Sequence, residues 1–286
     1  MKFQEIFTDQ KELERLRVQS RLITPYEKPV IERLLAGRQG LRVLDLGCNS
    51  GGKTHRYFSS PAVSAVLGLE FNSKLAEEAQ ERYGNEVFHF FPCDCGNASS
   101  AGKIRSIMAQ CGIESFDIIY LSFVLMHLPE AESVLKMLRD FLAPEGVLLI
   151  AEPYDGASVL SGEGNMLLQE FHAVLARDPY AGNRAFSAKL PEMLSRCGYL
   201  PKIENEEIRA LPGDTQKKQD IYTTFFTYLE DDLDLLLRSD PENSRLCRDA
   251  AWLRDNLPSL RSAILSDGTE ISMGFRVLTA RRCENG

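Results

Sequence analysis

The stretch Val-Leu-Asp-Leu-Gly-Cys-Asn-Ser-Gly-Gly, residues 43–52, decides the fold of this chain. It begins inside a short apolar run, residues 41–46, and continues into a glycine-rich turn. Glycine has no Cβ, so such a turn lets the backbone approach a ligand closely. In a parallel sheet covered by helices, this first turn lies at the carboxyl edge of the strands, where ligands bind. The stretch therefore predicts a ligand-binding turn between a buried strand and a helix.

The pattern around this stretch alternates between strands and helices. Further β-rich runs follow at 63–70, 87–91, 116–123, 147–152, 199–211 and 271–280, with helical stretches near 53–59, 73–83, 101–111, 130–142 and 188–197. Apolar strands separated by helices predict a mostly parallel sheet that is covered on both faces. Because crossovers in such a sheet are right-handed, we expect an α/β, doubly wound, Rossmann-like fold with seven strands.

Helical segments are expected at both flanks of this pattern. Residues 9–23 read as an amphipathic helix, which Pro25 and Pro29 interrupt before a second helical stretch at 30–36. The final third departs from strict alternation and contains helical, charged stretches. We therefore expect a helical N-terminal cover over residues 1–40 and a main domain over 41–286, with helical insertions at about 155–185 and 215–262.

Composition narrows the choice of partners and compartment. The chain has 286 residues, 44% of them hydrophobic, and a formal net charge of -8. A groove for nucleic acid phosphates would need a basic surplus, so we expect no nucleic acid partner. No apolar run has the length of a membrane span or resembles a signal peptide. The seven scattered cysteines do not suggest a disulfide framework, and Cys93 and Cys95 lack a second ligand pair for a metal. We expect a cytoplasmic protein without a metal site.

Three acidic residues lie at or just after the ends of consecutive predicted strands. Asp45 stands two positions before the first glycine of the turn, where a carboxylate would repel a pyrophosphate and suit a cationic ligand. Glu70 ends the second strand, where a carboxylate can accept both hydroxyls of a ribose, and Phe71 could stack beside an adenine. Asp94 follows the third strand and could accept a hydrogen bond from the adenine amino group. The turn by itself leaves a dinucleotide open, since Gly47, Asn49 and Gly52 occupy the glycine positions of the nicotinamide fingerprint.

Taken in order, these motifs resemble class I S-adenosylmethionine-dependent methyltransferases, above all bacterial members that act on small molecules. The resemblance covers residues 12–152 well and 186–199 loosely. It rests on residues 43–52, Gly-Leu-Glu-Phe at 68–71, Cys-Asp-Cys at 93–95, Phe-Asp-Ile-Ile at 116–119 and Val-Leu-Met-His-Leu-Pro at 124–129. It implies S-adenosyl-L-methionine as the cofactor and a methyltransferase activity.

The resemblance also implies which residues bind the cofactor. Ser122 matches the residue whose backbone faces the methionine part, and Gln19 or Arg21 in the N-terminal helix is expected to reach the methionine end. Asn49 stands where the family usually has glycine, and asparagine tolerates a positive φ better than most residues. The implied cofactor site consists of Asp45, Gly47, Cys48, Asn49, Gly51, Glu70, Phe71, Asp94, Cys95, Ser122, Phe123 and Gln19.

Candidates for acting on the methyl acceptor are fewer. His127 could serve as a general base or support the loop after the fourth strand, and Glu152 and Asp155 could accept a substrate proton or hold an amine. Tyr154 could line the pocket. His172 is expected to lie at the surface or in a lid, and the aromatic set Tyr222, Phe225, Phe226, Tyr228 and Trp252 forms either core or a substrate lid.

The sequence indicates only the chemical class of the methyl acceptor. The Asn/Asp-Pro-Pro-Tyr-type motif of adenine-N6 and glutamine methyltransferases is missing after the fourth strand, where Tyr-Leu-Ser-Phe stands at 120–123. We therefore expect methylation of an oxygen or nitrogen atom of a small molecule. Two alternatives remain: a noncatalytic protein that binds S-adenosylmethionine for regulation, and an NAD-dependent oxidoreductase.

Overall fold

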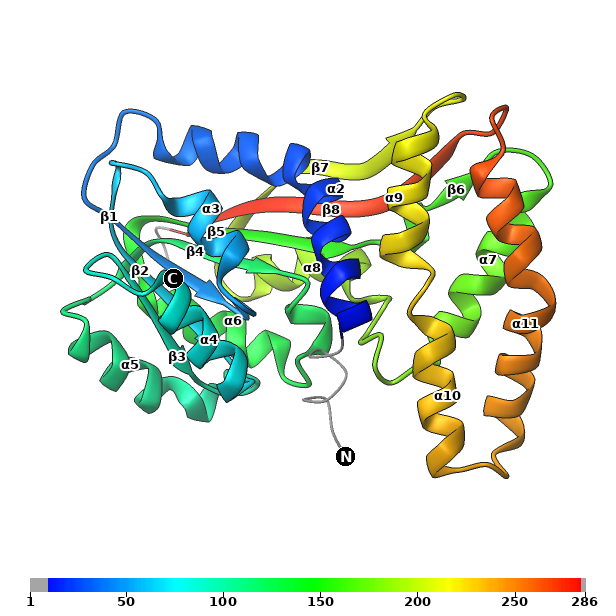
Figure 1. Ribbon diagram of the computed structural model, residues 1–286. Coiled ribbons are helices and arrows are strands. Elements are labelled where there is room, and N and C mark those ends of the chain that lie inside the picture. The colour runs from blue at the N-terminus through cyan, green and yellow to red at the C-terminus, as the bar shows by residue number, and fades with distance from the viewer. Residues whose placement is uncertain (1–9, 284–286) are drawn as a thin grey trace. The chain divides into compact units, whose positions relative to one another are not determined.

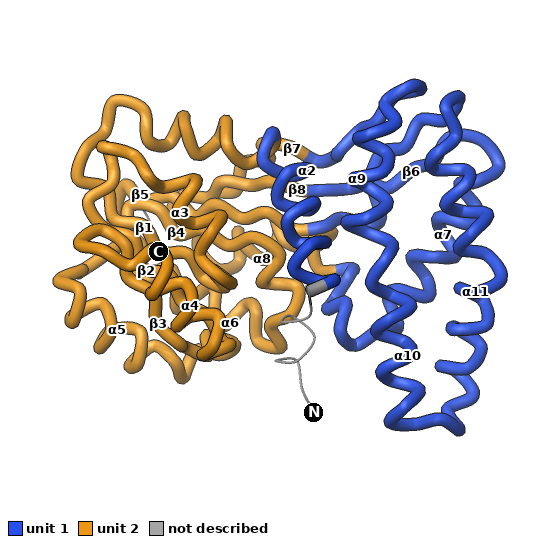
Figure 2. The backbone as a smooth tube through the Cα atoms, in the orientation of Figure 1, with its two compact units in different colours: residues 1–25, 153–185, 206–275 blue, residues 26–152, 186–205, 276–286 orange. Residues whose placement is uncertain are grey.

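The computed structural model describes residues 10–283 (Figure 1). The chain divides into two compact units, coloured separately in Figure 2. Unit 1 consists of residues 1–25, 153–185 and 206–275, and unit 2 of residues 26–152, 186–205 and 276–286. The glycine-rich turn belongs to unit 2, whereas both segments expected as helical insertions lie entirely in unit 1.

The sheet of unit 2 is built around the strand that precedes the glycine-rich turn. Its strands are β1 (Leu41–Leu46), β2 (Val63–Glu70), β3 (Phe88–Pro92), β4 (Phe116–Ser122), β5 (Leu142–Pro153), β7 (Tyr199–Ala210) and β8 (Ile271–Arg282), of which β5, β7 and β8 also have residues in unit 1. The strands follow the order β3-β2-β1-β4-β5-β8, and β7 pairs with β8. Pairing is parallel from β3 to β5. The strand order reverses direction at β1, which makes the ends of β1 and β4 the switch point where doubly wound sheets bind ligands.

The expected mostly parallel α/β fold is confirmed, with one strand more than predicted. An eighth strand, β6 (Val159–Leu160), pairs antiparallel with Ile271 and Ser272 in unit 1. Two residues are too few to produce an alternating pattern, so the sequence contains no signal for β6.

Helices cover both faces of the unit 2 sheet. They are α3 (Gly52–Phe58), α4 (Ser73–Tyr83), α5 (Ala101–Gln110), α6 (Ala131–Phe141) and α8 (Phe186–Arg196). Residues of α5, α6 and α8 share one buried cluster with Ile119 and Leu121 of β4. Tyr120 points to the opposite face, because side chains alternate along a strand, and there it packs edge-on against Phe58 of α3.

Unit 1 is mainly helical. It contains α7 (Gly164–Leu175), α9 (Thr215–Phe225), α10 (Leu229–Ser239) and α11 (Ser244–Leu265), and α11 packs against each of the other three. A proline lies inside α11 at Pro258, and Asn243 caps its start by accepting hydrogen bonds from the first backbone N–H groups.

The N-terminal helix differs from the prediction. Instead of breaking at Pro25 and Pro29, α2 runs without interruption from Gln10 to Leu35. Each proline removes a backbone donor, which favours a break. Glu27, between the two prolines, is fully buried and accepts hydrogen bonds from other elements of unit 2, which compensates for the lost backbone bonds. Within residues 10–283, no helix has the length and apolarity that a membrane span requires.

Candidate functional site

The turn after β1 has three residues in the left-handed region. Gly47, Asn49 and Gly51 have φ values of 77°, 51° and 72°. A Cβ on Gly47 would lie 2.5 Å from Cγ2 of Val124, so only glycine fits there. Asn49 replaces a glycine in a conformation that asparagine tolerates, and its Oδ1 accepts a hydrogen bond from the backbone N–H of Ser50 at 2.7 Å. The turn therefore keeps a glycine-like conformation at Asn49.

Glu70 connects this turn to the end of β2. One carboxylate oxygen accepts the backbone N–H of Asn49 at 2.8 Å, and the other accepts that of Asn72 at 2.9 Å. Burial raises the pKa of Glu70, and these backbone hydrogen bonds oppose the shift. An ionised carboxylate offers about four lone-pair sites, so Glu70 keeps acceptor capacity for a hydroxyl donor of a ligand. The neighbouring Phe71 is 51% exposed and offers an apolar ring beside the carboxylate.

Asp45 is a buried carboxyl at the end of β1. It is 3% exposed and accepts a hydrogen bond from the hydroxyl of Thr54 at 2.6 Å. Burial raises its pKa to about 6, and the hydrogen bond from Thr54 and the charge of Lys53 oppose that shift. Asp45 therefore changes its charge near neutral pH, beside the turn that is expected to bind a cationic ligand.

The third expected acid follows β3. Asp94 is exposed, and its Oδ1 accepts the backbone N–H of Gly96 at 2.8 Å, which shapes a tight turn. Cys93 and Cys95 on either side are buried free thiols. The hydrogen bond with Cys95 lowers the pKa of Cys93 to about 7, although burial opposes the shift, while the pKa of Cys95 is raised. Within the described residues, no group of potential ligands is arranged to hold a metal ion.

The loop after β4 has a strained backbone, and a side chain from β5 accepts hydrogen bonds from it. Phe123 has a φ of 58°, a conformation that is costly for a bulky residue and is found mainly at functional sites. Glu152 is fully buried, and its Oε1 accepts the backbone N–H groups of Val124 at 2.9 Å and Leu125 at 2.7 Å. His127 ends this loop and donates its backbone N–H to the carbonyl of Val124 at 3.0 Å. These contacts give Glu152 a part in shaping the loop.

Glu27 is a buried carboxylate beside the candidate site that was not predicted from the sequence. Its buried carboxylate accepts the hydroxyls of Tyr57 and Tyr120, both at 2.8 Å, and that of Ser122 at 2.7 Å. Nζ of Lys53 lies 3.8 Å away. The available signal was the spacing of Glu27, four residues from apolar Ile23 and Ile31, which places a carboxylate on the apolar face of a helix.

The structure groups the expected residues unevenly between the units. Asp45, Asn49, Glu70, Ser122 and Glu152 all belong to unit 2, together with the rest of the glycine-rich turn, Phe71, Asp94, Cys95, Phe123 and His127. Within unit 2, hydrogen bonds join Asn49 to Glu70 and tie Ser122 to Glu27. Gln19 and Asp155 belong to unit 1.

Two side chains of unit 1 have partners there that the sequence did not suggest. Arg21 forms a two-pronged ion pair with Asp220, with distances of 2.7 and 3.0 Å. Asp155 is 8% exposed and forms a buried ion pair with Arg184. Burial would raise the pKa of Asp155, but the charge and hydrogen bonds of Arg184 outweigh burial and lower it.

The structure excludes a surface position for His172 and favours one of the two interpretations of the aromatic set. His172 is 8% exposed and therefore does not lie at the surface. Tyr222 and Phe226 are buried and stack with ring centroids 5.6 Å apart, which favours the core reading. Trp252 donates its indole N–H to Glu170 at 3.0 Å.

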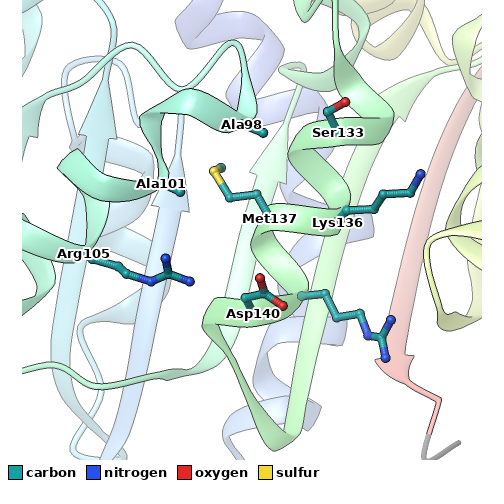
Figure 3. Close-up of a pocket in the computed structure, with 8 residues that line it drawn as sticks. Ala98, Ala101, Arg105, Ser133, Lys136, Met137 and Asp140 are labelled. Atoms are coloured by element: carbon teal, nitrogen blue, oxygen red, sulfur yellow. The ribbon is translucent and has the colours of Figure 1, made fainter. Parts of the chain in front are cut away.

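A separate hollow of unit 2 contains none of the expected site residues. It has a volume of about 580 Å³ and lies between η1 (Ala98–Ser100) with α5 and the helix α6 (Figure 3). Arg105, Lys136 and Asp140 are among the charged residues that line it. It therefore offers no support for the cofactor site expected at the carboxyl ends of the strands.

Comparison with known proteins identifies the domain around the turn. Residues 44–148 match the family model described as a methyltransferase domain. The chain is 40% identical over 193 residues to methyltransferase str2 of Strobilurus tenacellus, covering 62% of this chain and 64% of that protein. It is 24% identical over 132 residues to the ubiquinone biosynthesis O-methyltransferase of Haemophilus ducreyi, covering 46% of this chain and 52% of that protein. The chain thus spans about half the length of several curated relatives that it matches.

Solved structures agree on the fold. Phosphoethanolamine N-methyltransferase 2 of Haemonchus contortus, in complex with S-adenosyl-L-methionine, superposes with a TM-score of 0.55 at 14% sequence identity. The match covers 99% of this chain and 60% of that one. At this level of identity the likeness concerns the fold alone, and the expected Rossmann-like architecture is confirmed.

Proposed function

We propose that this chain, whose residues 44–148 match a methyltransferase domain, transfers a methyl group from S-adenosylmethionine to an oxygen or nitrogen atom of a small molecule. The domain and its methyltransferase relatives support the reaction type. The activity of the whole chain, the cofactor and the acceptor class are parts of this proposal.

The observation that carries the proposal is the position of Glu70. Its carboxylate lies at the end of β2, next to the glycine-rich turn, and is tied to that turn through the N–H of Asn49. Asp45 and Glu27 add two more buried carboxyl groups in the same unit. Such an acidic set favours a ligand with hydroxyls and positive charge and disfavours a pyrophosphate.

The side chains of unit 2 fit S-adenosylmethionine by their chemistry. Glu70 would accept the ribose hydroxyls, Phe71 would pack against the adenine, and Asp94 would accept from the adenine amino group. Asp45 would provide negative charge for the ammonium group, and Gly47 and Gly51 would let the backbone approach. When bound, the cofactor supplies an electrophilic methyl group on a positively charged sulfur.

The protein contributes alignment more than covalent chemistry. Methyl transfer is an in-line displacement, so positioning of the acceptor and exclusion of water provide much of the acceleration. Glu152 fixes the strained loop at Phe123 and Val124, and we assign it a positioning role. A general base is needed only when the acceptor must lose a proton, and His127 and Asp155 remain candidates for that role.

Calorimetry tests this proposal directly. The full chain should bind S-adenosylmethionine and S-adenosylhomocysteine but not NAD, and Asp45→Ala and Glu70→Ala should each weaken binding. Binding of NAD alone would replace the proposal with an oxidoreductase. If both adenosyl ligands bind but no molecule from a small-molecule extract accepts a labelled methyl group, the noncatalytic alternative is favoured.

A further inference from the structure

A histidine in unit 1 has polar atoms that the described residues leave unused. His172 lies on α7 and is 8% exposed. Neither ring nitrogen has a hydrogen-bond partner within residues 10–283. Leaving a buried donor or acceptor without a partner costs about 1–3 kcal/mol, and folded proteins rarely do so without a reason. Both nitrogens of His172 therefore lack a hydrogen-bond partner among the described residues.

The nearest charges to this histidine are already neutralised. Asp155 and Arg184 interact electrostatically with His172 and form a buried ion pair with each other. Nε of Arg184 donates to Asp155 at 2.8 Å, and Nη2 donates to the second carboxylate oxygen. An anionic ligand here would face the carboxylate of Asp155 while the guanidinium is already engaged. The pair therefore disfavours an acidic ligand.

Other buried groups of unit 1 agree with a neutral ligand. The hydroxyl of Thr224 is buried and also has no hydrogen-bond partner among the described residues. Burial and the adjacent Asp178 raise the pKa of Asp232 to about 8, so this carboxyl is largely protonated at neutral pH. Arg15 is engaged by Glu12 through two hydrogen bonds of 2.6 Å. Lys218, which is also fully buried in unit 1, donates from Nζ to the backbone carbonyl of Ser266 at 2.6 Å, so this ammonium is engaged as well.

The protonation state of His172 indicates the group that it would bind. Burial lowers its pKa, although the carboxylate of Asp155 opposes the shift. The imidazole is therefore neutral at pH 7, with one nitrogen as donor and the other as acceptor. A hydroxyl group can both donate and accept, so it matches either nitrogen. The ring of Phe171, whose centroid lies 6.0 Å from that of His172, adds an aromatic neighbour.

We propose that unit 1 binds the methyl acceptor, that the acceptor is a neutral molecule with a hydroxyl group on an apolar body, and that His172 hydrogen-bonds this hydroxyl. This inference rests on the proposed methyltransferase function. It assigns His172 to binding, and it places the acceptor's polar recognition in a part of the chain that the methyltransferase domain match does not include.

The test uses the full chain with saturating S-adenosylhomocysteine and a panel of phenols, each paired with the analogue that lacks the hydroxyl. Phenols should bind and the analogues should not. His172→Leu should weaken phenol binding about tenfold or more, which corresponds to the loss of one buried hydrogen bond. Because leucine leaves no polar atom without a partner, the midpoint of thermal unfolding should stay the same or rise. His89→Leu, the same substitution on β3 of unit 2, should leave phenol binding unchanged.

A second measurement uses the unaltered chain. Phenol addition should shift the imidazole ¹⁵N resonances of His172 in a sample labelled at histidine, and the analogues should not shift them. The inference is overturned if no phenol binds, if benzoates bind better than phenols, or if phenols bind without moving the His172 resonances. Failure of the underlying function has another signature, because S-adenosylhomocysteine would then fail to bind even the unaltered chain.

Discussion

The backbone N–H of Asn49 donates to the carboxylate of Glu70 at 2.8 Å, so the turn after β1 is fixed by a side chain from the end of β2. The second oxygen of Glu70 accepts the N–H of Asn72, the residue that caps α4. One carboxylate therefore holds two loops at the carboxyl edge of the sheet. A ligand that adds hydroxyl donors to Glu70 meets a group that is already fixed in place, which lowers the entropy cost of binding.

The first prediction concerns this double role of Glu70. Glu70→Ala leaves the N–H groups of Asn49 and Asn72 without their acceptor, and we expect a loss of about 2 kcal/mol in the free energy of unfolding. Glu70→Gln keeps an acceptor oxygen and should lose less stability. Both variants should bind S-adenosylhomocysteine more weakly in calorimetry. The control is Glu78→Ala on the exposed side of α4, which should change neither quantity. Equal affinity in all four proteins would contradict the role of Glu70.

The second prediction follows from the pKa of Asp45, which burial raises from 3.8 to about 6. Below pH 3.8 the carboxyl is protonated in both the folded and the unfolded chain. Between pH 3.8 and about 6 the folded chain holds the proton more tightly, so the free energy of unfolding falls as the pH rises. The total penalty above pH 6 is about 3 kcal/mol as an upper bound.

Asp45→Asn removes this titration and keeps an oxygen that can accept from Thr54. Urea unfolding at pH 4 and pH 8 should therefore show the variant gaining stability relative to the unaltered chain as the pH rises. The affinity of the unaltered chain for S-adenosylmethionine should increase as the pH rises, although its stability falls, because ionised Asp45 attracts a cationic ligand. The unaltered chain should bind more tightly above pH 6 than below it, and the variant should show no such step. A stability difference independent of pH would refute the assignment.

Prediction from sequence worked where local patterns determine structure. The apolar run at 63–70 became β2 with the expected bounds, and residues 73–83 became α4. It failed where tertiary contacts override local preference. Pro25 and Pro29 predict a break, yet α2 continues. Glu27, between the two prolines, is held by hydrogen bonds from residues that are 30 or more positions away in the sequence. No local pattern encodes such contacts.

The same limit applies to the candidate site. Asp45 and Glu70 were identifiable because each lies at the end of a strand, and parallel strands bring their carboxyl ends to one edge. The burial of His172 could not be predicted from the sequence, because it depends on the packing of helices that lie far apart in the chain. The partner of Asp155 is another example, since Arg184 is 29 residues away.

The third prediction tests Glu27 as the anchor of α2. Glu27→Ala leaves the hydroxyls of Tyr57, Tyr120 and Ser122 without their acceptor in a fully buried position, and we expect a loss of about 3–5 kcal/mol. Glu32→Ala in the same helix removes only an exposed pair with Lys28 at 3.5 Å and should change stability by less than about 0.5 kcal/mol. Urea unfolding measures both. Similar losses in the two variants would show that Glu27 is not an anchor.

The last prediction separates ligand stacking from folding at Phe71. Its side chain is 51% exposed, so Phe71→Ala should leave the free energy of unfolding within about 0.5 kcal/mol of that of the unaltered chain. If the ring packs against adenine, the variant should bind S-adenosylhomocysteine about tenfold more weakly, because stacking of a base on an aromatic side chain contributes about 1–3 kcal/mol. Phe71→Leu should recover part of this loss through apolar contact. Leu200→Ala removes an apolar side chain that is 61% exposed on β7 and should leave the affinity unchanged. If Phe71→Ala and Leu200→Ala bind the ligand equally well, the adenine does not lie against Phe71, and the exposed ring has to be explained by another contact.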